Sequence, residues 1–411
     1  MGGDVRETPG GVTGPIYLDY QATTPLAPEA AAAMRPWLDS HFANPHSSHR
    51  MGREAAAAVE VARERVMAAL TASLPGREPL GAGPPKAAET QAPTPPFEGG
   101  ELYFTSGATE AINWALKGAA ARLPAARRRI VALATEHAAV LDSVGYLAGW
   151  GFDVEILPVR PDGLVDLAAL EAALASPTGL VSAMLVNNEI GVIQPVAEIS
   201  ALARSAGALF LCDAVQGFSR VPLPLAGFDM VAVSAHKVHG PKGIGALWVR
   251  DGIDLDPLLH GGGQEAGLRS GTLSPALCVG FGEAARLLVE RAEEDHAHVE
   301  LLWEIALELM ASWNLNGSAE HRYKGNLSLR RDGIDSARLI SKVRSVAFSA
   351  GSACASGSGR PSHVLAALGL TDRQARSSLR FGFGRYTTQK QLLDALTIVD
   401  SHALLQLDEM P

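Results

Sequence analysis

The chain is poor in cysteine. Only three occur in 411 residues, Cys212, Cys278 and Cys354. They are too few and too scattered for a disulfide framework or an all-cysteine metal site. His236 and His239 lie close together, but no cysteine or acidic cluster near them completes a set of metal ligands. The sequence therefore predicts neither a disulfide-stapled protein nor a metal site.

The chain also lacks an excess of positive charge and any long apolar run. Its net charge of −9 argues against nucleic acid or an anionic membrane as the main partner. No apolar run reaches the length of a membrane span, and the first residues lack the apolar core of a signal peptide. With 47% hydrophobic residues the chain can bury a large core in two or three domains. We expect a cytoplasmic enzyme.

Hydrophobic periodicity is missing from residues 75–100, which are dense in Pro, Gly and Ala. We expect a flexible surface insertion there, and favour a tolerated loop over a partner-binding segment. Elsewhere short apolar runs alternate with amphipathic stretches, which predicts a largely parallel sheet covered by helices. The expected strands are near 101–105, 129–134, 152–157, 181–186, 208–212 and 228–233. Farther on, a long helical pattern over 274–313 leads away from this sheet, and strand patterns return at 325–330, 345–349 and 379–383.

Lys237 follows one of these apolar runs directly, in a stretch rich in glycine. Ligands of open α/β sheets bind at the ends of such strands, and desolvation there frees the lone pair of an amine. Taken alone, Lys237 is more simply a surface lysine in a turn. Residues 106–110, Ser-Gly-Ala-Thr-Glu, stand between a strand and a helix, where free N–H groups and the helix dipole favour a phosphate. Taken alone, they are an ordinary helix cap.

Polar residues recur where the expected strands end. Any one of them has a simple structural explanation: Asp213 as a helix cap, His137 as a loop histidine, Asn188 as a turn former. The carboxyl ends of parallel strands share one edge, however, so the whole set should converge. It provides the lysine, carboxylate and phosphate cradle that pyridoxal 5′-phosphate requires. The set comprises Thr109, His137, Asn188, Asp213, Gln216, Ser234, His236 and Lys237.

Nine motifs in one order resemble the cysteine desulfurases of the NifS/IscS type, members of the aminotransferase class V group. The resemblance runs from about Tyr17 to about Thr388. The motifs are Tyr17-Leu-Asp-Tyr-Gln-Ala-Thr-Thr-Pro25, Phe104-Thr-Ser-Gly-Ala-Thr-Glu110, Thr135-Glu-His137, Val186-Asn-Asn-Glu-Ile-Gly191, Cys212-Asp-Ala-Val-Gln216, Val233-Ser-Ala-His-Lys237, His260-Gly-Gly-Gly-Gln-Glu265, Leu268-Arg-Ser-Gly-Thr272 and Gly351-Ser-Ala-Cys-Ala-Ser356.

The resemblance implies the fold of PLP-dependent transferases of fold type I. A large domain, residues 27–290, would hold a mainly parallel seven-stranded sheet and the insertion at 75–100. A smaller α+β domain, residues 1–26 and 291–411, would carry the acceptor cysteine. It also implies a homodimer with shared sites.

The resemblance further implies a role for each matching residue. Lys237 forms the Schiff base and moves the Cα proton, Asp213 pairs with the pyridine nitrogen, and Gln216 bonds the ring hydroxyl. His137 stacks on the ring and acts as acid or base on the substrate sulfur. Asn188 and Arg380 bind the substrate carboxylate, and Cys354 accepts sulfur. Five residues hold the phosphate: Ala108, Thr109, Ser234, His236 and, from the other subunit, Thr272.

The expected reaction converts L-cysteine to L-alanine and leaves a persulfide on Cys354. The sulfur would pass to an acceptor protein for iron–sulfur cluster assembly, thio-cofactor synthesis or tRNA thiolation. In several relatives a longer C-terminal tail helps to dock the iron–sulfur scaffold. Here one helix and a short tail are expected after Thr388, so the identity of the acceptor protein stays open. The alternatives are a selenocysteine lyase, another class V lyase or transaminase, or a sulfur-relay protein with poor turnover. With Gly351, Gly357 and Gly359 around it, the Cys354 segment should be mobile.

Overall fold

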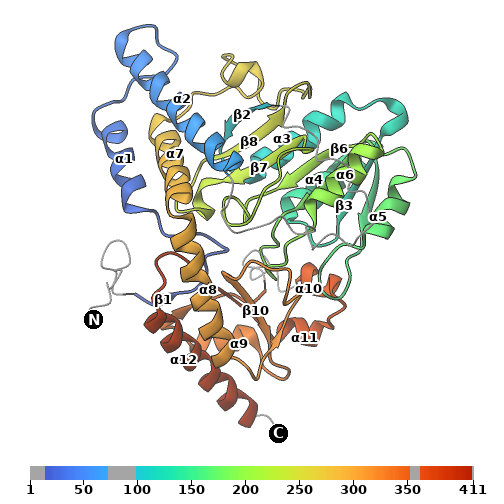
Figure 1. The fold of residues 1–411 in the computed structure, drawn as a ribbon, viewed down its shortest axis with the longest axis vertical. Helices are drawn as coiled ribbons and strands as arrows, with labels where there is room; N and C mark the ends of the chain where they lie inside the picture. Colours follow the sequence, from blue (N-terminus) through green and yellow to red (C-terminus); the bar gives the residue numbers. More distant parts are fainter. Residues whose placement is uncertain (1–13, 73–98, 352–361, 410–411) are drawn as a thin grey trace, which may run out of the picture.

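A computed structural model of the chain describes residues 14–72, 99–351 and 362–409. Its centre is a seven-stranded sheet in the order β2-β8-β7-β6-β5-β3-β4 (Figure 1). Of the seven strands, only β8 runs against its neighbours. The strands are β2 (Gly100–Thr105), β3 (Arg129–Leu133), β4 (Asp153–Leu157), β5 (Leu180–Met184), β6 (Leu209–Asp213), β7 (Met230–Ser234) and β8 (Gly245–Arg250). The prediction of a mainly parallel seven-stranded sheet is confirmed.

Both faces of this sheet are buried, which explains the continuous apolar runs of β5, β6 and β7. Along β7, Val231 and Val233 pack into one core, and Met230 and Ala232 into the core on the other face. The first face is covered by α2 (Arg50–Thr71), α5 (Leu167–Leu174), α6 (Val196–Ser205) and α7 (Pro275–Glu290). The second is covered by α3 (Ala108–Arg122) and α4 (Ala138–Ala148).

The long helical pattern after Ser274 forms two helices rather than one. They are α7 and α8 (Ala292–Leu309), separated at Arg291, whose φ of −107° and ψ of 12° are not helical. Helix α7 packs against α2 and α1 (Pro28–Asp39), whereas α8 packs against α12 (Gln389–Asp408) and leads into a second core (Figure 1). Because the two cores separate at Arg291, we propose it as the boundary between the large and small domains.

The second core surrounds a small sheet. Its antiparallel strands are β12 (Ser378–Gly382), β10 (Asn326–Arg330) and β9 (Asn314–Leu315), while β1 (Ile16–Tyr17) pairs in parallel with β11 (Val346–Ala347). Helices α9 (Ser336–Lys342), α10 (His363–Ala367) and α11 (Asp372–Arg376) complete this part. Leu18 is buried in the second core, so the N-terminal segment packs with the C-terminal part. The strand patterns expected near 325, 345 and 379 correspond to β10, β11 and β12.

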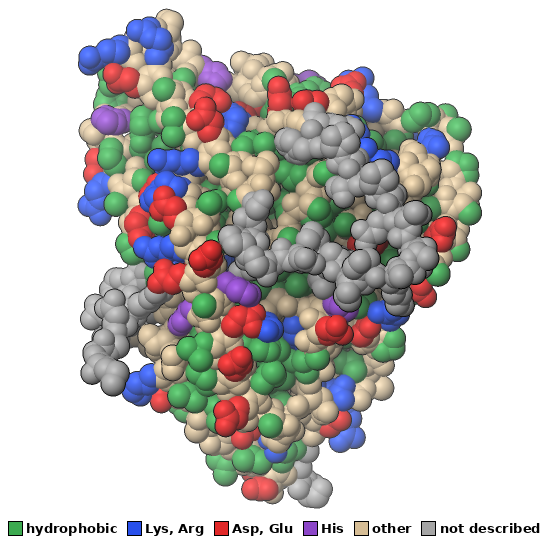
Figure 2. Space-filling view, in the orientation of Figure 1, with side chains coloured by type: hydrophobic (Ala, Val, Ile, Leu, Met, Phe, Trp, Pro, Cys, Tyr) green, Lys and Arg blue, Asp and Glu red, His purple; other side chains and the backbone are tan. Residues whose placement is uncertain are grey.

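Acidic and basic side chains are interspersed over the face drawn in Figure 2. Across the described ranges, none of the helices has both the length and the apolarity needed to cross a membrane. The insertion expected at 75–100 lies outside the described residues apart from its last two.

Candidate active site

Lys237 closes a single 3-10 turn, Ala235–Lys237, that begins as soon as β7 ends. Its Nζ donates hydrogen bonds to the backbone carbonyl oxygens of Gln21, at 2.6 Å, and Ala22, at 2.7 Å. The amine is therefore half-buried at the sheet edge and held against the N-terminal segment.

Asp213 is the last residue of β6, and Gln216 lies in the turn that follows. Burial raises the pKa of the Asp213 carboxyl, while the nearby side chains of His137 and Lys237 act to lower it. Gln216 Nε2 donates at 2.9 Å to the carbonyl of Gln21, the same oxygen that accepts from Lys237. The structure thus brings together residues predicted from three separate strand ends.

His137 caps the N-terminus of α4. Its Nδ1 accepts a hydrogen bond from the backbone N–H of Ala139 at 3.1 Å. In the neutral ring the proton is therefore on Nε2. That leaves Nε2 as the nitrogen able to donate to a bound molecule.

The first turn of α3 faces open space. A Cβ built at Gly107, the N-cap, would meet no atom within 4 Å, and Ala108 and Thr109 follow it. The first N–H groups of a helix have no partner within the helix and favour an anion. Gly245 approaches this turn so closely that a Cβ there would lie 2.7 Å from the Gly107 carbonyl carbon. Ser234 pairs with Gly245 across β7 and β8, which places β7's end beside the α3 N-terminus.

His236 binds to the N-terminal segment. Its Nδ1 lies 3.2 Å from the hydroxyl oxygen of Thr23, and its carbonyl accepts from the Thr24 hydroxyl at 3.0 Å. Burial, together with Lys237 and Lys242, lowers the pKa of His236 to about 4. The imidazole is consequently neutral at neutral pH and can serve as a hydrogen-bonding group.

Arg380 extends from β12 and is almost fully buried. Its Nη1 donates to the carbonyl of Asn188 at 3.0 Å, and its Nη2 pairs with Asp19 Oδ1 at 2.7 Å. The two predicted carboxylate-binding residues, from different parts of the chain, therefore meet. Within the described ranges, the buried Nε of Arg380 has no hydrogen-bond partner.

Two predicted residues are not brought into this group. Thr272 is exposed, although Arg269 of its motif pairs at 2.7 Å with Glu110 in the first turn of α3. Cys354 lies outside the described residues, as does most of its expected mobile segment.

Sequence reasoning missed several groups at this edge. Backbone carbonyls of residues 21 and 22 contact the lysine, yet the Tyr17–Pro25 motif suggested no role for them. Two buried carboxylates, Glu136 and Glu189, stand within quoted motifs beside His137 and Asn188. Their one available signal was an acidic residue next to a polar residue predicted for the site.

Burial, and next the charge of Asp213, raise the pKa of Glu136 to about 8. Its Oε1 accepts from the backbone N–H of Met184 at 2.7 Å, and its Oε2 from the Ser182 hydroxyl at 3.3 Å. The carboxyl groups of Glu136 and Asp213 are therefore both buried and close together at the sheet edge, which favours a state with one ionised and the other protonated.

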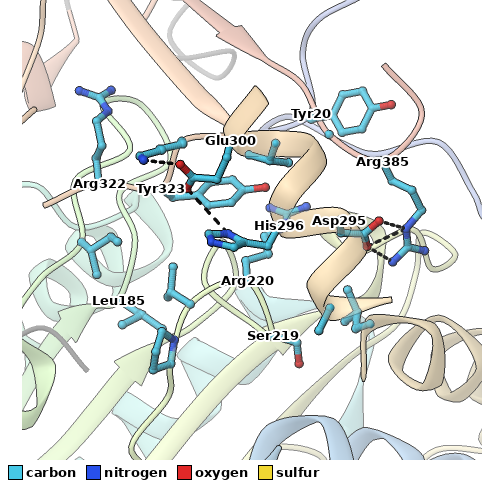
Figure 3. A pocket seen from close by; sticks show the side chains of 18 of the residues that line it. Tyr20, Leu185, Ser219, Arg220, Asp295, His296, Glu300, Arg322, Tyr323 and Arg385 are labelled. Atoms are coloured by element: carbon cyan, nitrogen blue, oxygen red, sulfur yellow. Dashed lines mark hydrogen bonds and ion pairs between the residues drawn. The ribbon is translucent and has the colours of Figure 1, made fainter. Parts of the chain in front are cut away.

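A cavity of about 210 Å³ lies between the large sheet and α8 (Figure 3). Two acidic side chains of its wall are paired with basic ones: Asp295 with Arg385, and Glu300 with Lys324. None of the residues predicted for the cofactor lines it. Arg220 connects it to the site, since this guanidinium donates to the backbone carbonyl of Lys237. The cavity is thus a neighbour of the site rather than the site itself.

Comparison with known proteins gives a consistent result. Residues 16–75 and 98–395 match the aminotransferase class-V family. Cysteine desulfurase IscS of Rickettsia akari (strain Hartford) is 42% identical over 399 residues, covering 95% of this chain and 91% of the relative. The corresponding protein of Rickettsia bellii (strain OSU 85-389) is 42% identical over 396 residues, covering 94% and 90%.

Solved structures agree. A NifS-like protein superposes with a TM-score of 0.82 at 32% identity, covering 95% of this chain and 100% of that one. The structure titled SspA in complex with cysteine gives 0.74 at 33% identity, covering 90% and 99%. The predicted family and fold are confirmed. With its sheet edge arranged as described and its match extending over most of its length, the chain belongs to the aminotransferase class-V family, among the cysteine desulfurases.

Proposed function

We propose that this protein uses pyridoxal 5′-phosphate to convert L-cysteine to L-alanine and leaves the sulfur on Cys354 as a persulfide. One observation carries the proposal. The side chains of Lys237 and Gln216 meet at the carbonyl of Gln21, at the sheet edge where Asp213 is buried. The names of the relatives support the choice of reaction.

The residues at this edge fit the cofactor. The open space in front of Gly107 suits a phosphate at the α3 N-terminus, with Ala108, Thr109, Ser234 and His236 to hold it. Asp213 offers a buried carboxylate for the pyridine nitrogen, and Gln216 an amide for the ring hydroxyl. Lys237 has an amine that can hold the cofactor covalently. When bound, pyridoxal phosphate supplies an electron sink that makes the Cα–H of cysteine acidic.

The side chains then have separate tasks. Arg380 and Asn188 bind the substrate carboxylate, which competes with Asp19 for the Arg380 guanidinium. Lys237 Nζ moves the Cα proton. His137 moves a proton at the substrate sulfur through Nε2, because Nδ1 is committed to the Ala139 N–H.

The transfer balances without an added oxidant or reductant. The Cys354 thiolate attacks the sulfur of the substrate, the Cβ–S bond breaks and an S–S bond forms. A proton is delivered to Cβ, so that L-cysteine and one thiol give L-alanine and one persulfide. Only the thiolate is a strong nucleophile, so the thiolate is the form of Cys354 that reacts in this step.

The remaining parts of the proposal concern partners. Thr272 is exposed in the single chain, and we assign it to the phosphate site of a second copy in a homodimer. A sulfur-acceptor protein of the cytoplasm, for iron–sulfur clusters, a thio-cofactor or tRNA thiolation, takes the persulfide sulfur. The small domain, residues 1–26 and 291–411, presents the acceptor cysteine to it.

The deciding experiment replaces Cys354 by serine. Cys354→Ser should retain the cofactor and exchange the Cα proton of L-alanine with deuterated solvent, but alanine formation from L-cysteine should fall roughly 100-fold or more. Wild type given L-cysteine without reductant should gain one sulfur on the Cys354 peptide. Cys278→Ala, which alters a buried free thiol in α7, is the matched control and should keep its activity. Unchanged alanine formation by Cys354→Ser would contradict the proposal.

A further inference from the structure

The two described residues that flank 352–361, Gly351 and Ser362, lie together at the carboxylate of Glu189. The Ser362 hydroxyl donates a hydrogen bond to Glu189 Oε2. A Cβ built at Gly351 would lie 3.4 Å from Ser362 Cβ and 3.5 Å from the same Oε2. The two residues that flank the segment containing Cys354 therefore both lie at the carboxylate of Glu189.

Each end is also hydrogen-bonded to the backbone of an element of the proposed site. Before the segment, Ser349 exchanges two backbone hydrogen bonds with Arg380, at 2.7 and 3.2 Å. After the segment, His363 Nε2 lies 2.9 Å from the carbonyl oxygen of Glu136, the residue before His137. One end is thus bonded to Arg380, proposed to bind the substrate carboxylate, and the other to the residue that precedes His137, proposed to act on the substrate sulfur.

Glu189 itself belongs to the turn that carries Asn188. Asn187 Oδ1 accepts from the N–H groups of Glu189, at 2.9 Å, and Ile190, at 3.0 Å, which fixes the turn. Helix α10, which Ser362 caps, packs its apolar face on Ile190 and neighbouring residues of the same turn. The end at Ser362 therefore rests on the turn through both a hydrogen bond and buried apolar contacts.

A stability role accounts poorly for this carboxylate. Glu189 is 2% exposed, and within the described ranges it forms no ion pair within 4 Å. Burial raises its pKa, and the Ser362 hydroxyl and the charges of His363 and Arg380 only partly oppose that rise. Burying a carboxylate without a contacting cation costs free energy that an apolar residue would not.

We propose that Glu189 is a positioning residue for sulfur transfer, on the basis of the function proposed above. By holding Ser362 beside Gly351 on the Asn188 turn, it fixes where the Cys354 segment starts and ends relative to the bound substrate. Steps that need only the cofactor and the substrate carboxylate do not depend on it. The step that needs the thiol does.

Two rates separate these steps. The first is exchange of the Cα proton of L-alanine with deuterated solvent, followed by NMR, which needs no thiol. The second is single-turnover alanine formation from L-cysteine, with the persulfide counted on the Cys354 peptide. Glu189→Ala should lower the second rate roughly 10- to 100-fold, because displacing a reacting group by about 1 Å costs about that much. The first rate should stay within about twofold of wild type.

Three further variants test the hydrogen bond from Ser362 to Glu189. Ser362→Ala removes the donor and should reproduce the selective loss, which also provides the test if Glu189→Ala does not fold. Glu189→Gln keeps an oxygen that accepts from Ser362 and should recover most of the transfer rate. Thr371→Ala removes the cap of α11, a change of the same chemical kind at a helix of the same length, and should leave both rates unchanged.

The outcomes are distinct. An equal fall in both rates, no fall in either, or failure of Glu189→Gln to recover transfer would overturn the proposal. A wild-type protein that neither exchanges L-alanine nor forms a persulfide would instead overturn the proposed function.

Discussion

Glu136 offers a quantitative test of the electrostatics at the sheet edge. It is fully buried, and the charged group that most raises its pKa is Asp213. Burial and that neighbour raise its pKa from an ordinary 4.5 to about 8. At neutral pH the folded protein therefore keeps a proton on Glu136 that the unfolded chain releases. Glu136→Gln replaces this carboxylic acid by a group of the same shape that cannot ionise.

The sign follows from which state holds the proton. Between pH 4.5 and about 8 the folded state binds more protons than the unfolded state, so stability from this group falls as pH rises. One pKa unit corresponds to about 1.36 kcal/mol, so the full contribution is at most about 5 kcal/mol. Glu136→Gln lacks this loss. Its free energy of unfolding relative to wild type should therefore rise by roughly 2 to 3 kcal/mol between pH 5.5 and 7.5.

The assay is thermal unfolding of both proteins with cofactor at pH 5.5 and 7.5. For a chain of this length, the expected rise corresponds to a gain of roughly 3 °C in the midpoint of Glu136→Gln relative to that of wild type. Glu283→Gln is a control of opposite sign, because hydrogen bonding to Arg286 lowers the pKa of Glu283. Its contribution is complete above pH 4.5, so this variant should be destabilised about equally at both pH values. A stability of Glu136→Gln minus that of wild type that stays constant or falls as pH rises would refute the reasoning.

Three further predictions concern the cradle, the substrate and the dimer. Gly245→Ala should lower cofactor affinity at least tenfold in an absorbance titration, since its Cβ would lie 2.7 Å from the carbonyl carbon of Gly107; Gly145→Ala, in open space on α4, should not. Arg380→Lys should raise KM for L-cysteine roughly 10- to 100-fold with a smaller change in kcat, because lysine lacks the bidentate fork; an unchanged KM would argue against a carboxylate site. Inactive Lys237→Ala and Thr272→Ala chains should partly restore activity in mixed dimers, and full activity of a monomer at nanomolar concentration would exclude shared sites.

The large sheet was predictable because parallel strands buried on both faces leave continuous apolar runs. The same geometry explains why polar residues predicted at separate strand ends meet: Asp213 is the last residue of its strand, His137 and Lys237 follow theirs, and the three strands end at one edge. The break at Arg291 was not predictable in the same way. Apolar residues continue on both sides of it, and only packing against two different cores requires the helix to stop there.

The contacts around Glu189 were beyond sequence reasoning for a related reason. Its partner Ser362 lies 173 positions away, and the Arg380–Asp19 pair spans 361 positions. No local pattern marks such pairs, because each residue satisfies the propensities of its own turn or strand. Motif resemblance placed Glu189 and Asp19 within matching motifs but assigned Glu189 no partner and Asp19 no role.

The N-terminal segment shows why a list of side chains could not have described this site. Gln21 and Ala22 bind Lys237 and Gln216 through backbone carbonyl oxygens, which every residue possesses and no sequence pattern distinguishes. The same segment joins the small-domain core at Leu18 and binds Arg380 through Asp19. A change in how the small domain sits would therefore move the acceptors of Lys237 and the Asp19 partner of Arg380 together. If the proposed substrate carboxylate displaces Asp19 from Arg380, it would act on a segment that also contacts the amine of Lys237.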